Sequence, residues 1–208
     1  EPYRRQRQMC IRDRLITGIG GCFNEMGWDA LNALSAEDRE AVLQAIFGKD
    51  GACFDYCRLP MGANDFAMSF YSSADVAGDF NLVNFNIDRD RYILIPYIKA
   101  ARQINPDLRI WASPWCPPPW MKTNNHYASA VRPSGEKDVN GLLPREAIAE
   151  FSTGFRMEEG YLKTYADYFA RFIKAYEAEG LPLECIHVQN EPCSNQVFPS
   201  CKWRTEDL

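Results

Sequence analysis

One carboxylate stands at the end of the last strand-like run of this chain, Val188-Gln189-Asn190-Glu191-Pro192. Apolar residues lead up to it, two amides precede it, and a proline stops the run. A carboxyl group that is partly removed from water can stay protonated near neutral pH and give that proton to a leaving group. Glu191 is therefore a candidate general acid/base, and the alternative is a loop carboxylate or a helix cap beside Pro192.

A charged pair follows an earlier apolar run, where Arg58 is succeeded after a short loop by Asp65. A carboxylate can accept hydrogen bonds from paired sugar hydroxyls. An arginine can orient an active-site carboxylate through charge-assisted hydrogen bonds. Both residues are candidates for substrate binding, and the alternative is an ion pair that only braces the loop.

Two indoles are held by prolines in the run Ser113-Pro114-Trp115-Cys116-Pro117-Pro118-Pro119-Trp120. Proline fixes the backbone φ angle, so this loop is stiff. The apolar C–H faces of a sugar stack on aromatic rings, which makes Trp115 and Trp120 candidates for a sugar-binding floor. Packing in the core is the alternative, above all for Trp120.

Glycoside hydrolysis is the chemistry that these residue types suit, because it needs two carboxylates across the scissile bond. Asn190 could donate to a sugar 2-hydroxyl, a contact that strengthens in the transition state. Side chains alternate along a strand, so Asn190 and Glu191 cannot both face the site in regular geometry. A bulge or distortion at the strand end is therefore expected.

Strands and helices alternate along the chain. The predicted strands are residues 15–23, 53–59, 108–112 and 185–189, and the predicted helices are residues 35–47, 90–104 and 161–179. Alternation of this kind predicts parallel βα units, and no Gly-rich phosphate loop follows any predicted strand. The fold class is therefore α/β, with a (β/α)8 barrel favoured over a doubly wound sheet. Since a full barrel takes about 250 residues, residues 15–208 are expected to form its first four βα units.

The period of two along the predicted strands assigns their faces. The residues expected to face outward onto helices are Leu108, Ile110 and Ala112 in one strand and Ile186 and Val188 in another. On the last predicted helix, the expected apolar stripe is Leu162, Ala166, Phe169, Ile173 and Tyr176. Two sets are expected to face the barrel axis: Trp111, Ser113 and Trp115; and His187, Gln189 and Glu191. The site residues then gather at the carboxyl ends of the strands, where barrel enzymes carry their chemistry.

Composition limits the classes of function. The chain has 208 residues, 46% hydrophobic and 13% aromatic, with a net charge of −5. Nucleic-acid binding needs clustered Lys and Arg, so no nucleic-acid partner is expected, and a neutral carbohydrate suits the chain better. No apolar run is long enough to span a bilayer. Secreted and cytoplasmic locations both stay open.

Cysteine and histidine contents argue against a metal site. The chain has eight cysteines but only two histidines, and no CxxC pair occurs. No zinc cluster is predicted from this pattern, and no cofactor is expected. Free buried thiols are the favoured interpretation, with a Cys193–Cys201 bridge as the alternative.

Residues 1–14 differ from the rest, since they hold five arginines against two acids and no apolar core. They are predicted to be a non-native or disordered extension. A basic arm for nucleic acid or membrane is the alternative.

Four motifs together resemble glycoside hydrolase family 30, the glucosylceramidase-like and endo-β-1,6-glucanase-like enzymes. They occur in order at the predicted strand ends: Gly18-Ile19-Gly20-Gly21-Cys22-Phe23; Arg58-Leu59-Pro60 with Asp65-Phe66; Ser113-Pro114-Trp115 with Pro119-Trp120-Met121-Lys122-Thr123-Asn124; and Gln189-Asn190-Glu191-Pro192. Cys22 departs from the pattern, where a small residue is more usual.

The resemblance implies a retaining β-glycosidase on a (β/α)8 barrel with an attached β-sandwich. It implies Glu191 as acid/base, Asn190 on the 2-hydroxyl, and Asp65 and Trp115 on the glycone. Arg58 would lie beside the nucleophile and Trp120 near the sugar. The family's nucleophile is a Glu on a later strand, so this chain is expected to be an inactive, truncated piece that lacks the nucleophile, the second half-barrel and the β-sandwich. A barrel protein that binds carbohydrate without cleaving it is the alternative.

Overall fold

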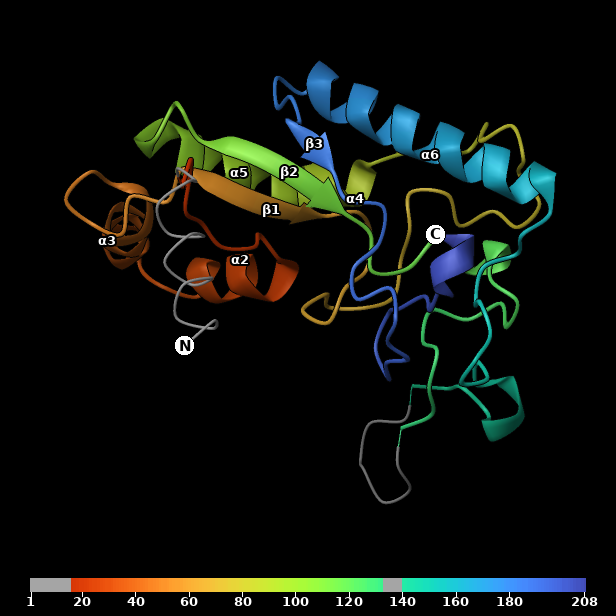
Figure 1. Ribbon diagram of the computed structural model, residues 1–208. Coiled ribbons are helices and arrows are strands. Elements are labelled where there is room, and N and C mark those ends of the chain that lie inside the picture. Colours follow the sequence, from red (N-terminus) through yellow and green to blue (C-terminus); the bar gives the residue numbers. More distant parts are fainter. Residues whose placement is uncertain (1–15, 133–139) are drawn as a thin grey trace, which may run out of the picture.

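A three-stranded parallel sheet forms the centre of the protein in this computed structural model, which describes residues 16–132 and 140–208. Its strands β1 (Tyr56–Pro60), β2 (Arg109–Ser113) and β3 (Cys185–Ile186) lie side by side in that order (Figure 1). Parallel strands joined through helices confirm the α/β class. The predicted extension of residues 1–14 lies outside the described residues.

The first predicted strand, residues 15–23, is not a strand in its described part. It runs beside β1 and makes one parallel bridge, Cys22 to Arg58. The Asp55 side chain accepts the Ile19 amide at 2.7 Å, so a side chain takes the place of a backbone partner and interrupts the ladder. Gly20 permits the close approach, because a Cβ there would lie 2.1 Å from the Tyr56 carbonyl oxygen. Four strands were expected, whereas the described residues contain three strands and one bridged segment.

Five α-helices are described: α2 (Glu25–Asn32), α3 (Ala36–Phe47), α4 (Asp88–Tyr92), α5 (Leu94–Ile104) and α6 (Glu159–Ala178). The Ser35 side chain accepts the Asp38 amide at the start of α3, as its sequence predicts. The helix predicted over residues 90–104 is broken at Ile93. Pro96 explains the break, because proline has no amide to donate to Tyr92 and its ring clashes with that carbonyl.

The two faces of the sheet differ in chemistry. Leu108, Ile110 and Ala112 are at most 1% exposed and pack in the core, as strand alternation predicted. That core joins the sheet to α5 and α6, and α5 lies directly against the sheet in Figure 1. Tyr56, Arg58 and Trp111 lie on the other face, so they are free to build a site.

Helix α6 buries Tyr176 as predicted, but its other buried residues differ from the predicted stripe. Its buried residues are Thr164, Tyr165, Tyr168, Phe172 and Tyr176, whereas Leu162 is 40% exposed. Two of its three buried tyrosines have paired hydroxyls, whereas the Tyr165 hydroxyl is buried without a hydrogen-bond partner. Tyr176 donates to Asp90 on α4 at 2.7 Å, and Tyr168 accepts the Ser73 amide at 3.4 Å.

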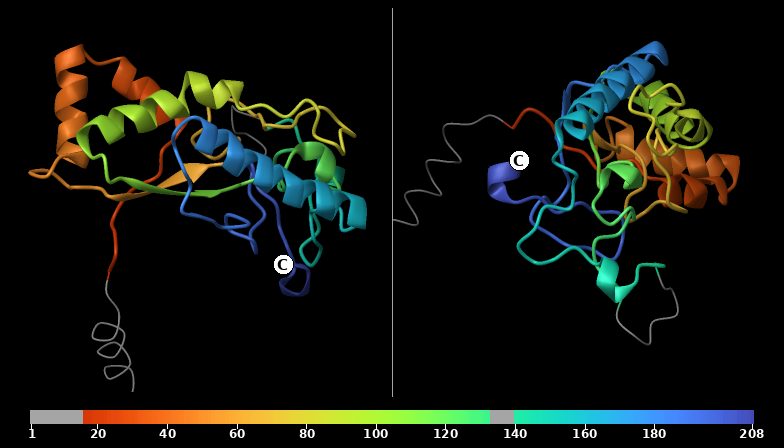
Figure 2. Two further views of the ribbon diagram at one scale, coloured as in Figure 1. Left: turned by 90° about the horizontal axis from the view of Figure 1, so that it is seen from above. Right: turned by 90° about the vertical axis from the view of Figure 1, so that its right-hand side faces the viewer.

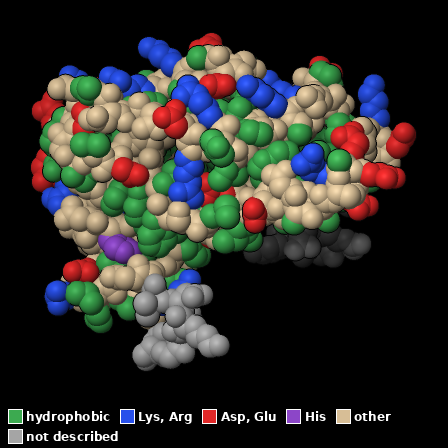
Figure 3. Space-filling view, turned by 180° about the vertical axis from the view of Figure 1, so that it is seen from behind, with side chains coloured by type: hydrophobic (Ala, Val, Ile, Leu, Met, Phe, Trp, Pro, Cys, Tyr) green, Lys and Arg blue, Asp and Glu red, His purple; other side chains and the backbone are tan. Residues whose placement is uncertain are grey.

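Long loops lie beyond the carboxyl ends of the strands, and Figure 2 shows them from two further sides. Three short 3-10 helices occur in these loops: η1 (Pro119–Met121), η2 (Pro144–Glu146) and η3 (Thr205–Asp207). On the face seen in Figure 3, basic and acidic side chains are interspersed among apolar ones. None of the helices in the described ranges has the length and apolarity to cross a bilayer.

Candidate active site

Arg58 on β1 is the centre of the polar cluster at the strand ends. Its Nη2 donates to Ser113 Oγ on β2 and to Asn190 Oδ1 after β3, both at 2.8 Å. The guanidinium lies over the Trp115 ring at 3.9 Å from its centroid and over the Trp111 ring at 5.0 Å. One arginine therefore joins the ends of three neighbouring strands by hydrogen bonds and cation–π contacts.

The segment after β3 leaves regular strand geometry before it reaches Glu191. The backbone N–H of Asn190 donates to the Pro114 carbonyl at 2.8 Å, and Glu191 has a φ of 46°. Left-handed backbone costs a non-glycine residue about 1–2 kcal/mol and often marks a functional site. A distortion of this kind was expected from strand alternation, and with it Asn190 contacts Arg58 while the Glu191 charge still acts on Arg58.

Glu191 is exposed, and its Oε2 accepts a hydrogen bond from Gln196 Nε2 at 3.1 Å. Asp65 is near enough for the Glu191 charge to act on it. Burial raises the pKa of Asp65, the negative charge of Glu191 raises it further, and Arg58 opposes both. Burial also lowers the pKa of the Arg58 guanidinium, while the charges of Asp65 and Glu191 raise it. The three charged groups thus form one electrostatic unit.

A buried ion pair that the sequence patterns did not reveal holds the loop with Asp65. Glu25 on α2 is fully buried and accepts Arg89 Nε and Nη2, both at 2.7 Å. Its Oε2 also accepts the Met68 amide at 2.8 Å. The bidentate pair ties α2 and α4 to the Asp65 loop, so it supports the site without touching it.

The two candidate tryptophans have different surroundings. Trp115 is 6% exposed and carries the Arg58 guanidinium on its face. Trp120 is 7% exposed, donates its indole N–H to the Ala74 carbonyl at 2.8 Å, and packs edge-on against Phe80. Trp120 is therefore held by contacts in the core, although its exposed fraction is close to that of Trp115.

The side-chain amide of Gln189 is hydrogen-bonded to two other segments of the chain. It is 8% exposed, and its Nε2 donates to the Trp115 carbonyl at 2.8 Å. Its Oε1 accepts the Trp203 indole N–H at 3.2 Å. Gln189 thereby fixes the backbone of the tryptophan loop against the chain after β3.

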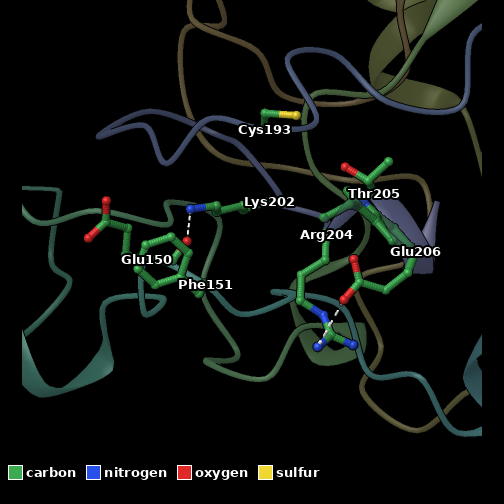
Figure 4. Close-up of a pocket in the computed structure, with 8 residues that line it drawn as sticks. Glu150, Phe151, Cys193, Lys202, Arg204, Thr205 and Glu206 are labelled. Atoms are coloured by element: carbon green, nitrogen blue, oxygen red, sulfur yellow. Dashed lines mark hydrogen bonds and ion pairs between the residues drawn. The ribbon is translucent and has the colours of Figure 1, made fainter.

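A cavity of about 510 Å³ lies in the loops that follow Glu191 (Figure 4). Its lining is Glu150, Phe151, Cys193, Lys202, Trp203, Arg204, Thr205 and Glu206. Lys202 Nζ donates to the Glu150 carbonyl and Arg204 pairs with Glu206, so the two cations of the lining are bound to groups of the same lining. None of the six predicted site residues lines this cavity.

Metal chemistry has no donor set in the described ranges, where no three His, Cys, Asp or Glu side chains converge. Cys193 and Cys201 are both free thiols, so the alternative of a bridge between them is wrong for this structure. Burial raises the pKa of the Cys201 thiol to about 12, which keeps it protonated and unreactive.

Comparisons with known proteins give a consistent family. The chain is 32% identical over 192 residues to putative glucosylceramidase 4 of Caenorhabditis elegans, covering 91% of this chain and 33% of that protein. It is 28% identical over 189 residues to an endo-1,6-beta-D-glucanase of Neurospora crassa, covering 89% of this chain and 35% of the relative. The chain thus spans about a third of the length of these relatives.

Solved structures agree with the fold described above. SrfJ from Salmonella typhimurium superimposes with a TM-score of 0.76 at 26% identity, over 93% of this chain and 38% of that one. The family model of the glycosyl hydrolase family 30 TIM-barrel domain matches residues 16–141, which is more than half of the chain. Because the family model, the relatives and the parallel sheet all agree, we conclude that the chain belongs to glycosyl hydrolase family 30 and carries part of its TIM-barrel domain.

Proposed function

We propose that the protein to which this chain belongs is a retaining β-glycosidase that cleaves a β-glucoside or a related β-linked glycan. Family membership supports the hydrolase class. The relatives named glucosylceramidase and endo-1,6-beta-D-glucanase support a glucosyl bond as the target. A carbohydrate is accordingly the proposed substrate, and no cofactor is required for this chemistry.

The arrangement of Arg58 carries the proposal. An arginine that hydrogen-bonds Asn190 and stacks on Trp115 holds an amide and an aromatic face beside a flanking carboxylate. In the proposed roles Glu191 is the acid/base, Asn190 binds the sugar 2-hydroxyl, and Asp65 and Trp115 hold the glycone. Arg58 orients the nucleophile through charge-assisted bonds. Trp120 anchors the end of the tryptophan loop through its hydrogen bond to the Ala74 carbonyl.

The proposed mechanism needs a second carboxylate about 5–5.5 Å from Glu191. We assign that nucleophile to a glutamate outside these 208 residues, together with the remaining barrel strands and a β-sandwich. The length of the relatives, about three times the matched part, supports this assignment. The 208-residue chain alone is therefore expected to be inactive, and turnover of an aryl β-glucoside by the purified chain would refute that.

Substitution of Glu191 in the complete protein tests the acid/base role. Glu191→Gln should reduce hydrolysis of substrates with poor leaving groups by 100-fold or more, since acid catalysis contributes roughly 10²–10⁴-fold. Activated aryl glycosides, whose leaving groups need no proton, should lose much less. Equal losses on both substrates would remove Glu191 from this role.

A matched control separates the specific effect from a general one. Glu177 is exposed on α6, so Glu177→Gln is expected to leave both rates unchanged. If the complete wild-type protein binds β-glucans but never cleaves them, it is a carbohydrate-binding protein instead of an enzyme.

A further inference from the structure

A buried lysine holds together the two loops that flank the site. Lys122 is fully buried, and its Nζ donates to the carbonyl oxygens of Tyr127, Ala128 and Ser200 at 2.9, 3.2 and 2.6 Å. It also contacts Ser129 Oγ at 3.3 Å. An ammonium group has three protons to donate, and here three backbone carbonyl oxygens and one hydroxyl take the place of water around it. Lys122 thereby joins the tryptophan loop to the loop after Glu191.

The same two loops pair directly through their backbones. Ser129 and Ala130 donate their amides to the Gln196 carbonyl at 3.0 and 2.9 Å. Ser200 donates its amide to the Tyr127 carbonyl at 3.0 Å, and Ala128 bridges Pro199 in antiparallel fashion. Two adjacent amides of the facing loop therefore hold the Gln196 carbonyl in place, although Gln196 lies in a loop.

The side chain of Gln196 reaches the proposed acid/base. Its Nε2 donates to Glu191 Oε2 at 3.1 Å and to Ser194 Oγ at 2.6 Å. An amide nitrogen has two protons, and both are used here. A donor aimed at a carboxylate stabilises the ionised form relative to the neutral acid.

We propose that Gln196 is a positioning residue that orients Glu191 and sets its balance between acid and carboxylate, and that Lys122 holds Gln196 in place. This inference rests on the proposed function. In the first step Glu191 gives its proton to the glycosidic oxygen as the C–O bond breaks and the nucleophilic carboxylate bonds to the anomeric carbon. In the second step the Glu191 carboxylate takes a proton from a water that attacks this carbon, and the bond to the nucleophile breaks. Gln196 stabilises the carboxylate that exists between the two steps.

The pH profile of kcat/KM for the complete protein tests the proposal, because a merely structural role would not move it. Loss of the acid proton sets the alkaline limb. Gln196→Met keeps the side-chain length but removes the donor, so the limb should move up by about 0.5–1 pH unit. Gln196→Glu, which keeps polarity and places a negative charge there, should move it up further. Gln103→Met, exposed on α5, is the matched control and should not move it.

An alkaline limb that stays in place in both Gln196 variants would overturn the proposal. Absence of turnover in the complete wild-type protein would refute the proposed function instead, and a second readout then applies. The carboxyl carbon of Glu191 can be titrated by carbon-13 NMR, with Glu191→Gln assigning the signal. An upward shift of its midpoint in Gln196→Met supports the contact, and an unchanged midpoint overturns it.

Discussion

Asp90 gives the protein a pH-dependent stability that can be worked out from its surroundings. It lies on α4, is 1% exposed, and accepts hydrogen bonds from Tyr71 at 3.0 Å and Tyr176 at 2.7 Å. Burial raises the pKa of Asp90 from 3.8 to about 6, although both tyrosine hydroxyls lower it. Burial therefore outweighs two hydrogen bonds, and the ionised form is disfavoured in the folded state.

The sign of the effect follows from proton uptake. Between pH 3.8 and about 6 the folded protein keeps the Asp90 proton while the unfolded chain has lost it. The free energy of unfolding must then fall as pH rises through this window, and it levels off above the folded pKa. A shift from 3.8 to about 6 corresponds to about 3 kcal/mol, at 1.36 kcal/mol per pKa unit.

Asp90→Asn isolates this contribution, because asparagine has the same shape and cannot ionise. We expect the free energy of unfolding of the wild type, minus that of Asp90→Asn, to rise by about 2 kcal/mol when pH is lowered from 7 to 4, because the unfolded carboxyl is still partly ionised at pH 4. Urea unfolding at several pH values measures it, and the other titrating groups cancel in the difference. Asp167→Asn, exposed on α6, is the matched control.

A difference that does not change with pH would refute the reasoning about burial. A difference that falls as pH is lowered would mean that the two tyrosines stabilise the carboxylate more than burial destabilises it. The first result would mean that the pKa of Asp90 is the same in the folded and the unfolded chain, and the second that the folded pKa is the lower of the two.

Three further substitutions test other contacts. Lys122→Met should lower the free energy of unfolding by about 1–3 kcal/mol, because charge-assisted hydrogen bonds are lost while burial of the charge is relieved. Lys163 is exposed on α6, so the control variant Lys163→Met should not change the free energy of unfolding. If Lys122→Met unfolds at the same urea concentration as the wild type, this view of Lys122 is contradicted. Trp120→Phe removes the hydrogen bond to Ala74 and should cost about 1–2 kcal/mol with little change in KM, whereas a large rise in KM would return Trp120 to the sugar site. Arg58→Lys in the complete protein should lower kcat/KM by about 10–100-fold with a folded circular dichroism spectrum, and wild-type kinetics would refute its central role.

Local patterns in the sequence were sufficient for the α/β class and for the parallel strands. Alternation along β2 predicted the buried face correctly, because period two follows from the backbone alone. The polar residues Arg58 and Asn190 meet because the carboxyl ends of parallel strands lie at one edge of a sheet. The need for a distortion before Glu191 also followed from alternation.

Only the tertiary structure decided the contacts that depend on partners far along the chain. The predicted α6 stripe was right at Tyr176 but missed Tyr168, whose burial depends on the Ser73 amide that a distant loop supplies to its hydroxyl. The burial of Trp120 and Lys122 likewise depends on acceptors supplied by distant loops. The sequence by itself determined the parallel strands and the candidate carboxylate, since these follow from periodicity and residue type. The hydrogen bond from Gln196 to Glu191 exists only because two irregular loops are fixed against each other, and no periodicity encodes that pairing.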